Sequence, residues 1–172
     1  MMHLPHPNMA EEMRDYAHKA DDDWLPWKPV LSTVTNEDIV ELEQKIQLTY
    51  LKLYIDFLKY KHFYELWPVE EITFFEHGIY EWKKKLLDKY FLSWLPDKLI
   101  DKGYICFADY EDWGIVCFDT TRRTGQDGDC EIIMVDHELL YDDPTPKRVL
   151  YSSFAEMIHT LVGAQKSMYP LP

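Results

Sequence analysis

Three short apolar runs between residues 104 and 136 form the clearest pattern in the chain. They are Tyr104–Phe107, Ile115–Phe118 and Ile132–Val135, and β-branched and aromatic residues crowd them. Trp113-Gly114 and Asp127-Gly128 separate the runs at points where the chain must reverse. The pattern therefore predicts an antiparallel meander. Its expected core strands are 104–108, 114–119 and 131–136.

A helical stripe precedes the meander. Thr35 and Asp38 have the spacing of a capping box, and no proline interrupts the pattern before Pro68. Apolar residues then recur every three or four positions, at Ile39, Leu42, Ile46, Tyr50, Leu53, Phe57, Tyr60 and Tyr64. This spacing predicts a long, straight helix that faces the core, with Phe57 among its buried side chains.

Further elements are predicted before the meander. Pro68 suits the first turn of a new segment, with Glu70 and Glu71 following it. A helix is then expected, with Ile79, Trp82, Leu86 and Tyr90 aligned on one side. The run Lys83-Lys84-Lys85 is expected to be its solvated face.

Two elements are predicted after the meander. Residues 141–146 contain two prolines and form an expected exposed loop, after which Arg148–Tyr151 can add a short strand. Ser153 and Glu156 have capping-box spacing and predict the start of a last helix. The fold class is therefore α+β, with a mainly antiparallel sheet packed against N-terminal helices and one C-terminal helix.

The chain divides into a main domain and an extension. Its 172 residues are enough for one domain, which we place at 35–165, with a tail at 166–172. Residues 1–34 are rich in proline and are expected to form an N-terminal extension with a short helix. The helix would begin at Asn8 and align Met9, Met13, Tyr16 and Ala20. Trp24 and Trp27, beside Asp21–Asp23, either anchor a partner or, as we expect, hold the extension against its own domain.

The charge balance restricts the kind of partner. Aspartate and glutamate number 31 against 18 lysines and arginines, which gives a net charge of −13. A negative field repels phosphate backbones and anionic lipids and attracts basic proteins or cations, so neither nucleic acid nor a membrane is an expected partner. The alternative is that the acidic surface serves solubility alone.

Cysteine usage and hydropathy bear on the compartment. The three cysteines are odd in number and lack CxxC spacing, which favours a reducing environment. The first residues do not resemble a secretion signal, and no apolar run approaches the ~20 residues that cross a bilayer. We therefore expect a cytoplasmic protein.

Several positions in and after the meander resemble the SUKH superfamily, which includes Smi/Knr-type regulators of fungal cell walls and many bacterial immunity proteins. The resemblance extends over residues 35–162 and lies in spacing. The matching residues are Ile105, Phe107, Ala108, Asp109, Gly114, Cys117, Asp119, Val135, Asp136, His137, Glu138, Ser153 and Phe154. It implies an immunity-type protein that binds and neutralises a cognate basic toxin, often a nuclease. The fungal branch implies a second possibility, a regulatory scaffold for several proteins.

Enzymatic and metal chemistry find little support in the sequence. His137 lies between Asp136 and Glu138, but neighbouring residues of a strand point to opposite faces and cannot converge. Asp127-Gly128-Asp129 lacks the frame of a calcium loop and suits a hairpin turn. We expect no catalytic residue, metal or cofactor. An enzyme with a small-ligand pocket between sheet and helices is the third and least favoured possibility.

The candidate binding residues combine carboxylates with aromatic rings. Charge would speed the encounter with a basic partner, and the rings would supply buried contact area. Five lie in the first meander turn: Asp109, Tyr110, Glu111, Asp112 and Trp113. Four more would join them if the loops share an edge: Asp127, Asp129, Asp142 and Asp143.

Overall fold

A six-stranded antiparallel sheet forms the centre of the protein. The computed structural model describes residues 9–17, 26–93, 97–124, 127–141 and 143–168. The strand order is β3-β4-β5-β6-β7-β8. The strands are β3 (Leu66–Val69), β4 (Ile72–Phe74), β5 (Tyr104–Tyr110), β6 (Gly114–Thr124), β7 (Asp129–Asp136) and β8 (Pro146–Tyr151). Because every neighbour is antiparallel and follows in chain order, the sheet is one continuous meander.

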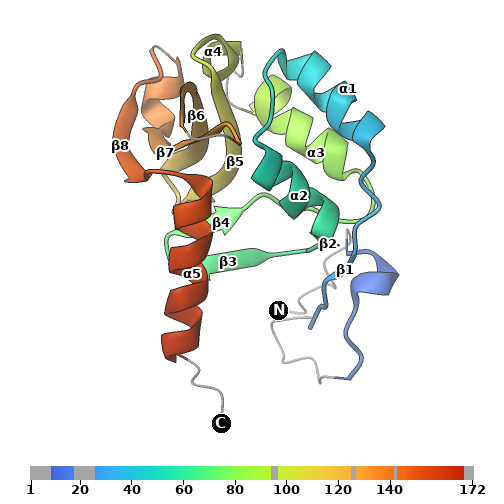
Figure 1. The fold of residues 1–172 in the computed structure, drawn as a ribbon. Coiled ribbons are helices and arrows are strands. Elements are labelled where there is room, and N and C mark those ends of the chain that lie inside the picture. The colour runs from blue at the N-terminus through green and yellow to red at the C-terminus, as the bar shows by residue number, and fades with distance from the viewer. Residues whose placement is uncertain (1–8, 18–25, 94–96, 125–126, 142, 169–172) are drawn as a thin grey trace, which may run out of the picture.

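Helices pack around this sheet, so the fold is α+β as predicted. They are α1 (Asn36–Ile46), α2 (Lys52–Tyr60), α3 (Trp82–Asp88), α4 (Asp97–Asp101) and α5 (Phe154–Met168). Figure 1 shows α1, α2 and α3 gathered on one side of β5, with α5 running past β3 towards the C-terminus. A π-helical turn, η2 (Lys89–Ser93), continues α3, and 3₁₀ turns form η1 (Glu11–Met13) and η3 (His137–Tyr141).

The three predicted core strands are confirmed as β5, β6 and β7. β6 is longer than expected, because residues beyond Asp119 continue as an exposed ribbon to Thr124. Gly128 has a φ of 66°, the left-handed conformation that its hairpin turn requires. The expected strand near 148–151 is also present as β8, which pairs with β7.

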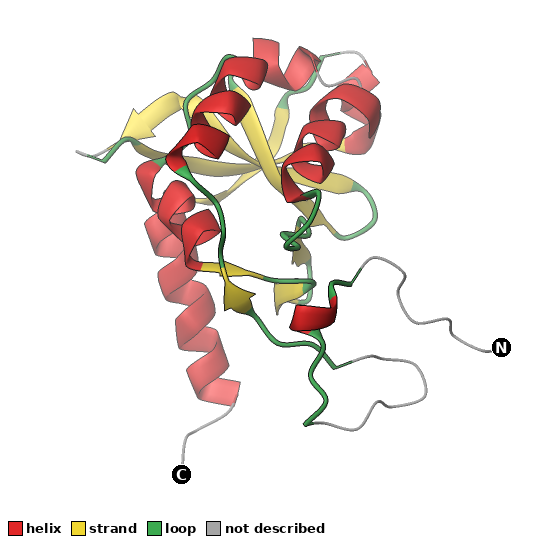
Figure 2. Ribbon diagram, turned by 90° about the vertical axis from the view of Figure 1, so that its right-hand side faces the viewer, coloured by secondary structure: helices red, strands yellow, loops and turns green. Residues whose placement is uncertain are grey.

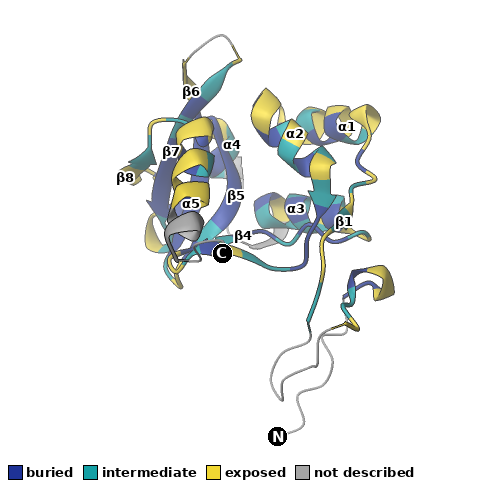
Figure 3. Ribbon diagram, turned by 60° about the horizontal axis from the view of Figure 1, so that its bottom comes forward, coloured by how far each residue is buried: buried dark blue, intermediate teal, exposed yellow. Residues whose placement is uncertain are grey.

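Aromatic side chains fill the core between the sheet and two helices. The rings of Phe107 and Phe118 stack with centroids 4.1 Å apart, and Phe154 of α5 meets both edge-on. Tyr54 of α2 packs against the same rings. Figure 3 shows the result, with buried strands and an exposed outer face on α5.

The prediction of a long, straight helix is wrong. The chain forms α1 and α2 instead, and α1 ends at Gln47, whose φ of 56° is left-handed. The Glu43 carboxylate accepts a hydrogen bond from the Tyr50 amide and holds the connection. The break changes the direction of the apolar stripe, so Leu53 and Tyr60 are exposed and Phe57 is only half-buried.

The segment at Pro68 also differs from the prediction of a helix-like first turn. It forms the hairpin β3–β4, whose turn carries Glu70 and Glu71. Pro68 is tolerated because β3 is an edge strand, where its missing N–H leaves no ladder hydrogen bond unmade. The hairpin adds two strands to the expected sheet.

The lysine run on α3 connects elements and is not simply a solvated face. Lys83 lies 3.0 Å from Asp38 and 2.5 Å from Glu41, both on α1. Lys85 lies 2.7 Å from Glu76, which precedes α3. These ion pairs join α3 to two different parts of the chain.

The N-terminal region contacts the main fold through a small sheet and a small apolar cluster. β1 (Val30–Leu31) pairs with β2 (Lys61–His62), and Met9 and Met13 pack near Tyr64. The expected N-terminal helix is reduced to η1, and Tyr16 is exposed. Figure 2 shows η1 beside the main body. The other residues proposed for this extension, Asn8, Ala20, Asp21–Asp23 and Trp24, lie outside the described residues.

Two buried histidines join this region to α2. The ring of His62 accepts a hydrogen bond at Nε2 from the Thr33 amide (3.0 Å), so its proton lies on Nδ1, which donates to the His77 carbonyl (3.2 Å). His77 donates from Nε2 to the Leu58 carbonyl (2.8 Å). These bonds make the His62 ring neutral. Burial favours the neutral form of both rings, because it lowers the pKa of His77 to about 4 and that of His62 below its usual value.

Candidate functional site

The turn between β5 and β6 is held in a defined conformation. Glu111 has a left-handed φ of 48°, and its amide donates to the Glu71 carbonyl at 2.8 Å. Its carboxylate accepts a hydrogen bond from the indole Nε1 of Trp113 at 2.5 Å. Asp112, at the tip, is exposed. The turn therefore presents carboxylates and one tryptophan from a rigid support.

The β3–β4 turn lies directly beside it. Ile72 pairs with Tyr110, so Glu70 and Glu71 adjoin Glu111 at the same end of the sheet. Sequence reasoning missed these two glutamates because the pairing of β4 with β5 joins segments more than thirty residues apart. The available signal was local: two acidic residues between two short apolar runs, which is typical of a hairpin turn.

The end of β7 completes this acidic surface. Asp136 pairs with Gly114, and the His137 amide donates to the Trp113 carbonyl at 2.9 Å. Glu138 follows and is exposed. We call this surface the acidic edge, and define it by Glu70, Glu71, Glu111, Asp112, Asp136 and Glu138.

Two basic residues of β8 partly neutralise the acidic edge. Lys147 lies 2.9 Å from Asp136 and lowers the pKa of that carboxyl, and its ammonium also lies 4.5 Å from the centre of the Trp113 ring. Arg148 covers the ring of Tyr110 and donates to its hydroxyl. The edge retains a clear excess of carboxylates.

The two aromatic candidates have different surroundings. Tyr110 is buried, with 7% of its surface exposed, and forms the floor beneath the turn. Trp113 is half-buried and meets Tyr110 edge-on at 5.5 Å. Trp113 is therefore the ring that a partner can reach.

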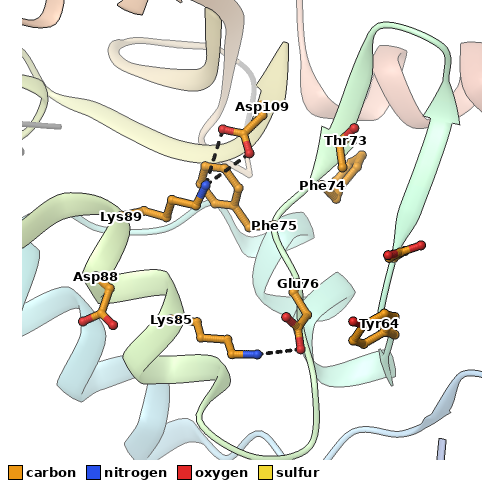
Figure 4. A pocket seen from close by; sticks show the side chains of 10 residues that line it. Tyr64, Thr73, Phe74, Phe75, Glu76, Lys85, Asp88, Lys89 and Asp109 are labelled. Atoms are coloured by element: carbon orange, nitrogen blue, oxygen red, sulfur yellow. Dashed lines mark hydrogen bonds and ion pairs between the residues drawn. The ribbon is translucent and has the colours of Figure 1, made fainter. Parts of the chain in front are cut away.

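Asp109 belongs to a neighbouring cleft. It lies on β5 and pairs with Lys89 of η2 at 3.1 Å. Figure 4 shows both side chains in a cleft between α3–η2 and the β3–β4 hairpin, and the cleft volume is about 380 Å³.

The structure separates three of the other four candidates, Asp127, Asp129 and Asp143, from the acidic edge. Asp129 pairs with Thr124 and lies seven residues along β7 from Asp136, which places it about 23 Å away at the rise of a strand. Asp127 precedes it in the same hairpin. Asp143 pairs with Lys102 at 2.5 Å, and Asp142 lies outside the described residues. The eight candidates that the structure describes therefore do not share one surface.

Asp129 has a structural partner that the sequence did not reveal. Its carboxylate accepts hydrogen bonds from the amides of Phe154 and Ala155, at 2.9 and 3.1 Å, and so caps α5 from another element. The predicted capping residues also act, but in a shifted arrangement. Ser153 Oγ accepts from the Glu156 amide, whereas the Glu156 carboxylate accepts from Ser152.

The described residues offer little for catalysis or metal binding. Within them, no group of three or more histidine, cysteine or acidic side chains is arranged to hold a metal ion. All three cysteines are buried free thiols, and burial raises the pKa of Cys106 and Cys130 to about 12, so the reactive thiolate is disfavoured. Each helix in the described ranges is too short or too polar to span a bilayer.

Comparison with protein families identifies the class. The chain matches the SMI1/KNR4 family (SUKH-1) over residues 33–160, which is most of its length. The chain therefore belongs to this family, and the resemblance to the SUKH superfamily is confirmed. Domains of this family are generally binding proteins, often immunity proteins. No similar sequence was found among curated proteins.

Proposed function

We propose that this SUKH-1 domain is an immunity-type protein, which binds a cognate basic toxin and neutralises it through the acidic edge. The observation that supports this most is that three separate segments bring six carboxylates to the end of the sheet that carries Trp113. A nuclease-like toxin suits this surface, because an enzyme that binds the phosphate backbone of nucleic acid has to present basic residues.

Charge and aromatic contact would have separate roles in binding. The net charge of −13 attracts a basic partner over a distance, and the acidic edge orients it. Trp113 then supplies buried contact area, as aromatic anchors do at the centres of interfaces. If this protein covers the phosphate-binding surface of the toxin, the nucleic-acid substrate can no longer bind there.

The proposal predicts a slower association when the turn is reversed in charge. The double change Glu111→Lys with Asp112→Lys should lower the association rate with the toxin about tenfold or more at low salt, because it places repulsion at the point of contact. Stopped-flow mixing measures the rate. Both residues are exposed, so the thermal unfolding midpoint should change little.

A matched control separates the acidic edge from net charge. Asp101→Lys with Asp127→Lys makes the same charge change away from the edge. This control should retain most of the association rate. Equal slowing by both double variants would show that only net charge matters, and full protection of toxin-producing cells by the Glu111/Asp112 variant would exclude the turn as the interface.

The toxin itself is identified by capture from the source cells. The tagged protein should retain one basic protein from a lysate, less tightly as salt rises, and co-expression should protect cells from that protein. Recovery of many unrelated proteins would instead favour a regulatory scaffold.

A further inference from the structure

The cleft beside the acidic edge already holds a side-chain cation. The ammonium of Lys89 lies 3.1 Å from the Asp109 carboxylate and 4.3 Å from the centre of the Phe75 ring. Figure 4 shows Lys89 extended across Phe75 towards Asp109. A carboxylate and a ring face together make a site that recognises organic cations.

The lining of the cleft carries more acid than base. The carboxylates of Glu65, Glu76, Asp88 and Asp109 surround two ammonium groups, those of Lys85 and Lys89. Glu76 and Lys85 form a second ion pair at 2.7 Å. Asp88 is paired with Lys84 of α3 at 2.5 Å. The lining therefore keeps an excess of one carboxylate over its paired cations, so a further cation suits the cleft better than an anion.

The ion pair between Lys89 and Asp109 is partly open to water. The side chains of Lys89 and Asp109 are each about one-third exposed, at 31% and 33%. Ion pairs this close to water contribute little net stability, so an incoming cation can replace Lys89 without much loss. Lys89 could then turn outwards to water on its flexible stem.

The position of the cleft connects it with the proposed interface. Asp109 lies on β5, two residues before Glu111 of the turn, and its strand partner Thr73 lies on β4, two residues after Glu71. A protein bound at the acidic edge would therefore have the cleft within reach of a long side chain.

We propose that the cleft receives an arginine side chain presented by the basic partner, which displaces Lys89 from Asp109 and Phe75. The inference deepens the proposed function and rests on it for the identity of the partner. Arginine is favoured over lysine because its planar guanidinium stacks on a ring and bonds a carboxylate with two donors at once.

Titration with a small cation tests the cleft without the toxin. N-acetyl-arginine amide, added to the full ¹⁵N-labelled chain, should shift the backbone amide signals of Thr73, Phe75, Lys89 and Asp109 in a saturable way. N-acetyl-citrulline amide, the neutral isostere, should not, and N-acetyl-lysine amide should bind more weakly. No shift, equal binding of citrulline or lysine, or preferential binding of inorganic phosphate at these residues would overturn the proposal.

Two variants give opposite expectations. Asp109→Asn should abolish the arginine-dependent shifts, because it removes the charge that holds the guanidinium. Lys89→Met should strengthen binding severalfold, because it removes the internal competitor and keeps the apolar stem. Lys52→Met, which alters an exposed ion pair on α2, is the matched control and should bind like the wild type. Weaker or unchanged binding by Lys89→Met would contradict displacement.

The outcomes separate this inference from the proposed function. If the toxin is captured through the acidic edge but arginine amide does not bind, the cleft proposal fails and the function stands. If arginine amide binds but reversal of Glu111 and Asp112 leaves toxin association unchanged, the proposed interface fails and the cation site stands.

Discussion

The sheet and the junction between the N-terminal region and α2 are stabilised in contrasting ways. The junction is defined by Thr33, Leu58, His62 and His77. Phe107, Phe118 and Phe154 are fully buried and meet one another ring to ring. At the junction, by contrast, neutral His62 and His77 connect Thr33 to Leu58 through hydrogen bonds. Apolar burial is insensitive to protonation, whereas a buried imidazole holds its contacts only while it is neutral. The stability of the junction should therefore depend on pH, whereas the stability of the sheet should not.

Truncation of the aromatic core should have the largest effect. Phe118→Ala should lower the free energy of unfolding by about 3–5 kcal/mol, because it removes a fully buried ring and leaves a cavity. Phe57→Ala should cost less, since Phe57 is half-buried, although it touches Phe63 and Phe74. Urea denaturation measures both. An equal loss for the two variants would show that burial does not rank these positions.

Acidification should have the second largest effect, because it destabilises the junction. The pKa of His77 falls from 6.5 to about 4 on folding, because burial disfavours the imidazolium. The unfolded chain therefore binds the proton first. The contribution of His77 is fully present above pH 6.5 and is lost as the pH falls towards 4, by up to about 3 kcal/mol.

Denaturation curves at several pH values check this. His77→Gln should be less stable at neutral pH but should show a shallower decline between pH 6.5 and 4. His159→Gln, which changes an exposed histidine on α5, should leave the decline unchanged. A decline in His77→Gln as steep as in the wild type would assign the pH dependence to other groups.

The smallest of these effects concerns the cap on α5. Asp129→Ala should cost about 1–2 kcal/mol, because two amides at the start of α5 lose their acceptor. Asp127→Ala, two residues earlier and exposed, should be close to neutral. Thermal unfolding of the pair measures the difference. Similar melting temperatures would mean that water replaces the cap.

The sequence by itself determined the elements whose signals are local. β5, β6 and β7 followed from short apolar runs, rich in β-branched and aromatic residues, between turns. α1 begins at the capping box of Thr35 and Asp38, where both reciprocal hydrogen bonds form. The position of the meander turn at Glu111–Trp113 also followed from the pattern. These features depend on residues close together in the chain, so they can be predicted from the sequence alone.

Only the tertiary structure decided which acidic residues lie together. Asp129 resembled a surface carboxylate but caps a helix twenty-five residues away, and Asp109 faces a cleft opposite Lys89. Glu70 and Glu71 join Glu111 because β4 pairs with β5, and the left-handed turn at Gln47 splits a stripe whose periodicity continues through it. The reason is physical. Charge and periodicity are properties of single residues and short windows, whereas the partner of a carboxylate and the neighbour of a strand depend on how distant segments pack.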